Sequence, residues 1–183
     1  MQYHPHTVQA RASTALGPVR LAASPKGLCG VWFEGQRHEP SRLLHGNSAW
    51  AEAADHALLQ QATHQLQQYL RGERDGFDLP LDLSGGTPFQ QEVWHALLAI
   101  GRGGTCTYGH LSEQLGRPRA VRAVGAAVGR NPLSVVVPCH RVLGADGSLT
   151  GYAGGLDRKA ALLTLENAPS QHARSPAPQK GHA

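Results

Sequence analysis

The sequence predicts an α+β protein, with a small sheet and one helix in its first half and mostly helices in its second. Two short β-prone runs flank a turn near the N-terminus, an amphipathic segment follows, and four further helical segments occupy the second half. A chain of 183 residues is long enough to bury a sizeable core. The flexible triplet at 84–86 marks a boundary, which predicts domains at 1–86 and 87–167 and a disordered tail at 168–183.

The first half contains the strand signals. Residues 18–23 and 28–33 are β-prone, and the Ser, Pro, Lys and Gly between them suit a hairpin turn. Residues 55–70 repeat apolar side chains at helical spacing, which predicts an amphipathic helix. Residues 77–83 alternate weakly, and we expect a third strand there.

The second half begins with a helix signal. Thr87 and Gln90 form a capping box, and Pro88 suits the first helical position of a helix over 87–100. Helices over 108–115 and 119–128, separated by Gly116, Arg117 and Pro118, resemble a helix-turn-helix. Three valines at 135–137 predict a buried strand, and a last helix is expected over 156–166.

Charge, apolar runs and cysteine content indicate the kind of partner and compartment to expect. The net charge is +4, and the segment 102–141 carries six arginines against one acid, Glu113. Such a basic face favours polyanions, because bound phosphates release condensed counterions, although a solvated surface is equally compatible. No apolar run approaches the ~20 residues of a membrane span, and we see no secretory signal. Cys29, Cys106 and Cys139 are odd in number and far apart, which predicts reduced thiols and a cytoplasmic location.

The run Pro138, Cys139, His140 and Arg141 is the candidate centre of chemistry. A cysteine attacks as its thiolate, and with a pKa of about 8.5 little thiolate exists at neutral pH. A neighbouring imidazole and the charge of Arg141 would each favour ionisation. On these residues alone the alternative stays open, because a cysteine after three valines is commonly a buried core residue.

Glu166 lies in the last turn of its predicted helix. The helix dipole disfavours a negative charge there by roughly 0.3–1 kcal/mol. The sequence therefore predicts a compensating partner for this carboxylate, and the imidazole of His140 is a candidate. A solvated glutamate is the other interpretation.

From residue 87 to residue 166 the sequence resembles the O6-alkylguanine-DNA alkyltransferase family. The matching segments are TPF at 87–89, YG at 108–109, RAVG at 122–125, RNP at 130–132, PCHRV at 138–142 and GYAGGL at 151–156. The first 86 residues match only in size and layout. The resemblance implies a ribonuclease H-like roll followed by a domain whose helix-turn-helix binds the minor groove of duplex DNA.

The resemblance also implies direct-reversal DNA repair. The alkyl group of O6-alkylguanine, with O4-alkylthymine as a further candidate, would move irreversibly to Cys139. His140 is implied as the base that acts on this thiol through a water, with Glu166 as its partner. Tyr108 is implied as a hydrogen-bond donor to the leaving guanine, and Asn131 as the support of Cys139 and the hinge to the second helix.

The same resemblance implies how DNA is held. Arg122 would fill the gap left by a flipped nucleotide, and small residues would let the helix approach the duplex closely. The expected DNA-binding residues are Arg119, Ala120, Arg122, Ala123, Gly125, Ala126, Arg130 and Arg141. The expected guanine pocket comprises Val142, Tyr152, Ala153 and Gly154. We expect a monomer, leave clustering along DNA open, and expect neither cofactor nor metal, since no paired-ligand spacing occurs.

Other functions fit less well. An alkyltransferase-like protein would bind lesions without transfer, but such proteins lack the acceptor cysteine that Cys139 provides. A regulator resembling the bacterial Ada protein would need a further domain rich in metal-binding cysteines. A Cys-His hydrolase would turn over and need an oxyanion hole. Cys29 and Cys106 are interpreted as small core residues.

Overall fold

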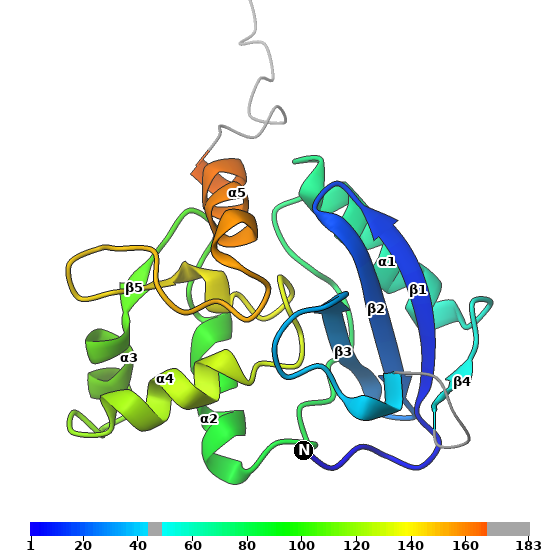
Figure 1. Ribbon diagram of the computed structural model, residues 1–183, viewed down its shortest axis with the longest axis horizontal. Helices are drawn as coiled ribbons and strands as arrows, with labels where there is room; N and C mark the ends of the chain where they lie inside the picture. Colours follow the sequence, from blue (N-terminus) through cyan, green and yellow to red (C-terminus); the bar gives the residue numbers. More distant parts are fainter. Residues whose placement is uncertain (44–48, 168–183) are drawn as a thin grey trace, which may run out of the picture.

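The first half of the protein is a four-stranded mixed sheet with one helix across it (Figure 1). The structure is a computed structural model that describes residues 1–43 and 49–167, so the predicted tail lies outside the described residues. The sheet order is β3-β2-β1-β4, where β1 is Val8–Thr14, β2 Gly17–Ser24, β3 Gly27–Phe33 and β4 Ala51–Glu52. β1, β2 and β3 run antiparallel, and β4 is parallel to β1. The 3-10 turn η1 (Ser41–Leu43) precedes β4, and α1 (Ala57–Leu70) follows it.

The predicted hairpin is confirmed as β2 and β3, whereas β1 was not predicted. Gly27 at the start of β3 has a φ of +153°, and a Cβ there would lie 2.5 Å from the carbonyl oxygen of Pro80. Only glycine fits this approach. The expected strand at 77–83 is wrong: Leu81 forms one isolated bridge with Leu28, because Pro80 offers no N–H and the segment touches β3 only briefly.

The second half is mostly helical, as predicted. It comprises α2 (Pro88–Leu98), β5 (Cys106–Thr107), α3 (Tyr108–Gln114), α4 (Val121–Gly129), η2 (Cys139–Arg141), β6 (Val142–Leu143) and α5 (Leu156–Asn167). The capping box of Thr87 and Gln90 is present at the start of α2. α3 and α4 follow one another in the order expected of a helix-turn-helix, but α4 begins at Val121, so Arg119 and Ala120 precede it.

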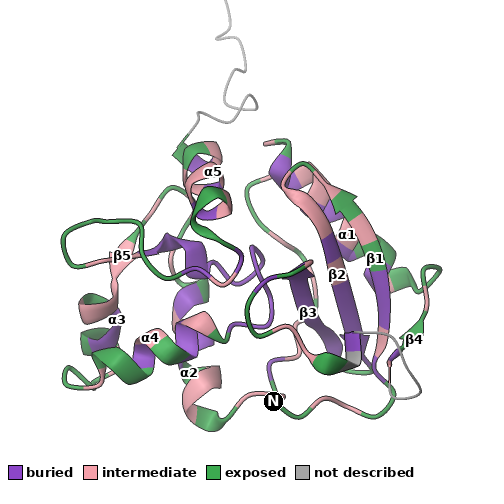
Figure 2. Ribbon diagram, in the orientation of Figure 1, coloured by how far each residue is buried: buried purple, intermediate pink, exposed green. Residues whose placement is uncertain are grey.

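One apolar core runs through both halves (Figure 2). The junction is made by the edge strand β3, whose Val31 receives a 2.9 Å hydrogen bond from Ser134 N and donates one of 2.9 Å to Pro132 O. The segment that leads to Cys139 is therefore fixed against the sheet. Among the residues described, no helix is long and apolar enough to cross a membrane.

The expected strand at 135–137 is also wrong. These valines are buried, but they form a turn in which Val137 N donates to Leu133 O at 2.9 Å. Val135 has a φ of +72°, a conformation that a β-branched residue adopts only when its surroundings impose it. Pairing of Ser134 with β3 and the return toward Cys139 impose it here.

Candidate active site

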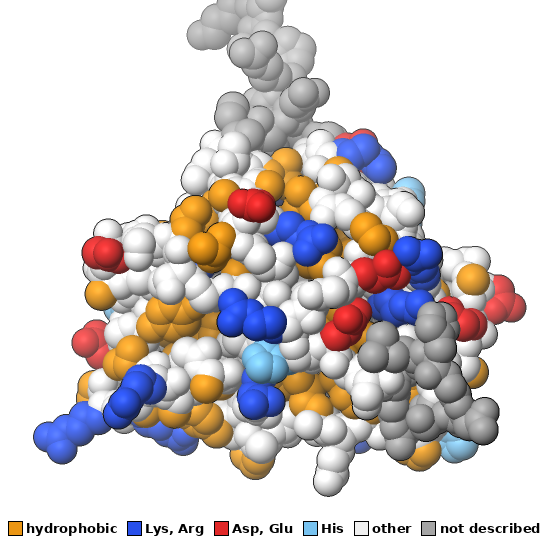
Figure 3. Space-filling view, viewed as in Figure 1, with side chains coloured by type: hydrophobic (Ala, Val, Ile, Leu, Met, Phe, Trp, Pro, Cys, Tyr) orange, Lys and Arg blue, Asp and Glu red, His pale blue; other side chains and the backbone are white. Residues whose placement is uncertain are grey.

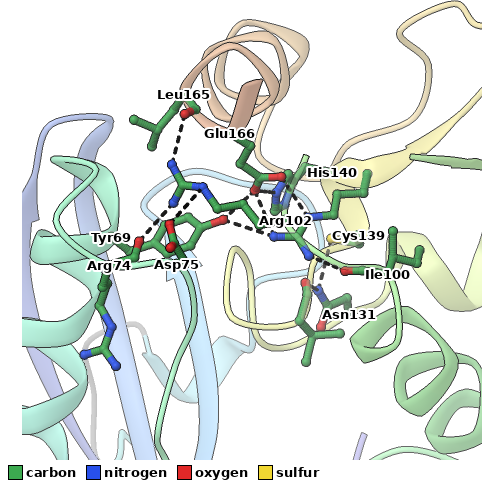
Figure 4. A network of polar contacts seen from close by, with 12 residues as sticks. Tyr69, Arg74, Asp75, Ile100, Arg102, Asn131, Cys139, His140, Leu165 and Glu166 are labelled. Carbon is green, nitrogen blue, oxygen red and sulfur yellow. Dashed lines mark hydrogen bonds and ion pairs between the residues drawn. The ribbon is translucent and has the colours of Figure 1, made fainter. Parts of the chain in front are cut away.

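Cys139 opens the short turn η2 and is held in place by Asn131. The side-chain amide of Asn131 donates to Sγ of Cys139 at 3.0 Å and to Val137 O at 2.8 Å, while its oxygen accepts from Leu133 N at 3.0 Å. Both residues are buried. The amide thus connects the end of α4 to the sulfur through fixed backbone contacts (Figure 4).

His140 and Glu166 form a buried pair beside this sulfur. Nε2 of His140 lies 2.5 Å from Oε1 of Glu166, and neither side chain is more than 1% exposed. The other ring nitrogen, Nδ1, is buried and has no hydrogen-bond partner among the described residues. Burial lowers the pKa of His140, and the hydrogen bond to Glu166 opposes this without reversing it, so the ring is neutral at neutral pH.

Glu166 has the compensating partners that its place at the end of a helix predicts. Tyr69 Oη donates to Oε1 at 2.6 Å, and Arg141 donates from Nε to Oε2 at 2.8 Å and from Nη2 to Oε1 at 3.2 Å (Figure 4). Burial opposes ionisation of Glu166, but the hydrogen bonds from His140 and Arg141 outweigh it and hold its pKa well below the usual range. The carboxylate is therefore charged even though it is buried.

The position of Arg141 corrects two expectations. Its side chain is buried, bonded to Glu166, Tyr69 and the carbonyl oxygen of Ile100, and so is not on the surface where DNA phosphates could reach it. Its charge also does not make Cys139 a thiolate at rest. Burial raises the pKa of the Cys139 thiol to about 11, although the hydrogen bond from Asn131 partly offsets this.

Lys159 is a member of the site that the sequence analysis missed. Its side chain is fully buried on α5, and Nζ donates at 2.6 Å to Val142 O and at 2.6 Å to Thr150 O. Its positive charge lowers the pKa of Cys139, against the larger effect of burial. Lys159, Leu162 and Glu166 are the buried residues of α5, and their spacing of three and four would have placed the lysine on the inner face.

A cavity of about 510 Å³ lies beside this cluster. It is bordered by Tyr108, by Arg122, Gly125 and Ala126 of α4, and by the loop with Tyr152 and Ala153. Tyr108 Oη donates to Gly151 O at 3.1 Å. The Tyr152 ring packs edge-on against the His140 ring, with 6.4 Å between the ring centres. Burial, followed by the charge of a Cys139 thiolate, raises the pKa of both phenols. Cys139 itself does not line the cavity, and the cluster meets the cavity wall through Tyr152, which packs on His140, and Thr150, which accepts from Lys159.

Of the remaining expected residues, one lines this cavity and others lie on α4 or just before it. Arg130 lines it, Ala123 and Arg119 are exposed, and Ala120 caps α4. Val142 and Gly154 were expected in the guanine pocket, yet neither lines the cavity: Val142 is buried and pairs with Cys106, and Gly154 packs against the Tyr152 ring. Within 1–43 and 49–167, no three His, Cys, Asp or Glu side chains are grouped as metal ligands.

Comparison with known proteins decides the family. The 6-O-methylguanine DNA methyltransferase models match in two parts, the ribonuclease-like domain at residues 8–83 and the DNA binding domain at residues 88–168. A methylated-DNA–protein-cysteine methyltransferase of Mycobacterium tuberculosis is 48% identical over 151 residues, covering 82% of this chain and 87% of that protein. The chain belongs to the 6-O-methylguanine DNA methyltransferase family.

Two further relatives support the same family. A protein of the same name from Salmonella typhimurium is 43% identical over 162 residues, covering 87% of this chain and 95% of its own. The crystal structure of Mycobacterium tuberculosis OGT in complex with DNA superposes with a TM-score of 0.77 at 42% identity, covering 88% of this chain and 93% of that one. The α+β fold inferred from the sequence is that of the family.

Proposed function

We propose that the protein reverses alkylation damage by moving the alkyl group of O6-alkylguanine in DNA onto Sγ of Cys139. The activity is that of a methylated-DNA–protein-cysteine methyltransferase. One observation supports Cys139 as the acceptor: Asn131 fixes its sulfur next to the His140–Glu166 pair, and His140 packs against Tyr152 of the cavity wall. Burial raises the pKa of the Cys29 and Cys106 thiols as it does that of Cys139, so the surroundings of the sulfur, and not its pKa, distinguish the acceptor.

The first chemical step is loss of the thiol proton. Because Cys139 rests as a thiol and His140 as a neutral ring, the pair is ready for transfer of one proton from sulfur to imidazole. Nδ1 of His140 is the free acceptor, and we propose that the proton passes from Sγ to Nδ1 through one bound water. The ionised Glu166 stabilises the imidazolium that forms, while Lys159 stabilises the thiolate.

Alkyl transfer follows at carbon. Sγ forms a bond to the alkyl carbon as the bond from that carbon to O6 breaks, and the electron pair stays on the guanine. Tyr108 donates a proton to the guanine so that it leaves neutral, and the imidazolium proton restores the phenol through solvent. The net change moves one proton from the thiol to the guanine. A thioether has no carbonyl for water to attack, so each molecule reacts once.

The partner is double-stranded DNA, bound through α4 in the minor groove. The damaged nucleotide rotates into the cavity, since its O6 is inaccessible within the stack, and extrusion costs a few kcal/mol. Arg122 occupies the gap, and the exposed Ala123 and Ala126 permit close approach of the helix. Phosphate contacts by Arg119 and Arg130 position the protein without reading sequence.

We further assign DNA binding and alkyl acceptance to residues 87–167, and support of the acceptor site to residues 1–86. The protein acts as a monomer in the cytoplasm. O4-alkylthymine is a second candidate substrate for the same cavity.

Stoichiometry tests this function. With methylated duplex in excess, transferred methyl groups should plateau at one per protein molecule. Continued turnover would identify a hydrolase, and tight lesion binding without transfer would identify an alkyltransferase-like protein. A Cys29→Ser variant serves as control and should plateau like the unchanged protein.

A further inference from the structure

The loop between β3 and η1 brings the N-terminal half to the base cavity. Arg37 and His38 line the cavity together with α4, and Arg37 N donates to Ala153 O at 3.1 Å. The preceding Gln36 is buried, and its Oε1 accepts from Phe33 N at 2.9 Å and from Ser134 Oγ at 3.1 Å. The loop is thus anchored to both segments that surround Cys139, and Figure 1 shows it reaching toward the end of α4.

His38 adopts an uncommon backbone conformation in this loop. Its φ is +65°, one of two positive values among the described non-glycine residues. Such a conformation costs free energy and persists where the surroundings or the function impose it. His38 and Arg130 also line a second cavity, of about 640 Å³, so these side chains form the ridge between two hollows.

The charge around the cavity is of one sign. Arg37, Arg122 and Arg130 line it, no acidic residue does, and none of the three forms an ion pair within the described part of the chain. Among the other arginines whose side chains the structure describes, six of nine form ion pairs with acids, as Arg141 does with Glu166. Figure 3 shows basic and histidine side chains gathered at the middle of this face, over the junction of the two halves.

A nucleotide whose base enters the cavity must leave its phosphates at the mouth, because the sugar joins the two. We propose that Arg37 binds the DNA phosphate backbone next to the flipped nucleotide, so that the N-terminal half clamps the strand that α4 holds from the other half. The proposal rests on the proposed function for the identity of the DNA. It assigns the loop after β3 a direct share of DNA binding.

Salt-dependent binding tests the clamp. In a Cys139→Ser background, which prevents transfer, an Arg37→Ala variant of the full chain should bind duplex carrying O6-methylguanine several-fold more weakly, with a plot of log affinity against log salt that is less steep by about one. Arg37→Lys should keep most of the slope, since it keeps the charge. Lys26→Ala is the matched control: Lys26 is exposed, lines neither cavity, and lies at the opposite end of β3. It should leave affinity and slope near those of the unchanged protein.

Reaction with free O6-benzylguanine separates binding from damage to the site. Any loss of rate in Arg37→Ala should be several-fold smaller on the free base, which has no phosphate, than on alkylated duplex. An unchanged salt slope, an equal loss in Lys26→Ala, or an equal loss on free base and duplex would each overturn the clamp. If the unchanged protein transfers no alkyl group, the proposed function fails whatever the slopes show.

Discussion

The hydroxyl of Tyr69 donates a 2.6 Å hydrogen bond to Oε1 of Glu166, the same oxygen that lies 2.5 Å from Nε2 of His140. Tyr69 belongs to α1 of the first half, and its ring is buried and stacked on Phe77 at 4.9 Å. The N-terminal helix therefore contributes to the environment of the base that activates Cys139.

A Tyr69→Phe change keeps the ring and removes the hydroxyl. Glu166 loses one donor, so it becomes more basic and raises the pKa of His140. Because His140 accepts the thiol proton only when neutral, the acid limb of the transfer rate should move to higher pH. The pH profile with free O6-benzylguanine measures this. A uniform loss of rate with no displaced limb would mean that the hydroxyl acts on packing alone. Loss of a hydrogen bond to a charged group should also cost about 1.5–3 kcal/mol of unfolding free energy.

Lys159→Met should slow transfer by removing the charge that favours the thiolate. The pKa of Cys139 rises further, and each unit of rise lowers the thiolate fraction about tenfold. Val142 O and Thr150 O lose their donor, at a cost of about 1–3 kcal/mol for each carbonyl left unsatisfied. Thiolate absorbance against pH measures the titration. If it coincides with that of the unchanged protein while the fold is intact, Lys159 has no electrostatic role.

Glu166 should make stability depend on acid pH. Its pKa is depressed in the folded protein, so its contribution is fully present above the unfolded pKa of about 4.3 and is lost as the pH falls toward the folded value. Urea unfolding at a series of pH values should show decreasing stability below about pH 5. Glu166→Gln should flatten that decrease. An unaltered pH dependence in the variant would place the acid-sensitive group elsewhere.

Arg122→Ala should separate base flipping from chemistry. The side chain is exposed on α4 and lines the cavity, and within the described part of the chain no hydrogen bond or ion pair joins it to Cys139 or His140. The rate of transfer from alkylated duplex should therefore fall at least about tenfold, while the rate with the free base stays as before. A tenfold loss corresponds to about 1.4 kcal/mol of lost transition-state stabilisation. Parallel rate measurements on both substrates decide it, and equal losses would refute the wedge role.

Local signals predicted much of the fold. The capping box at Thr87 predicted where α2 begins. The amphipathic pattern predicted a start for α1 that lies two residues before the observed one. The turn at 24–27 identified the hairpin because its residues suit that geometry in isolation. The motif around Cys139 and the position of Glu166 led to the reactive cluster, in which the structure pairs His140 and Glu166 across a separation of 26 residues.

Features set by tertiary contacts were not predictable in the same way. Val136 lies in a β-prone run, but docking of Ser134 on β3 turns the chain there. β1 has a weak pattern because it carries a buried glutamine, Gln9, whose amide bonds to Trp50 O at 2.9 Å. The burial of Arg141 and Lys159 depends on partners distant in sequence, and charged residues are ordinarily expected at the surface.

The most direct test of the account is the intact mass of the protein after exposure to duplex carrying O6-methylguanine, with the modified peptide mapped. Every active molecule should gain the mass of one methyl replacing one hydrogen, carried on Cys139, and Cys139→Ser should gain nothing while still binding the duplex. Absence of the gain in the unchanged protein, or its location on another side chain, would contradict the central claim.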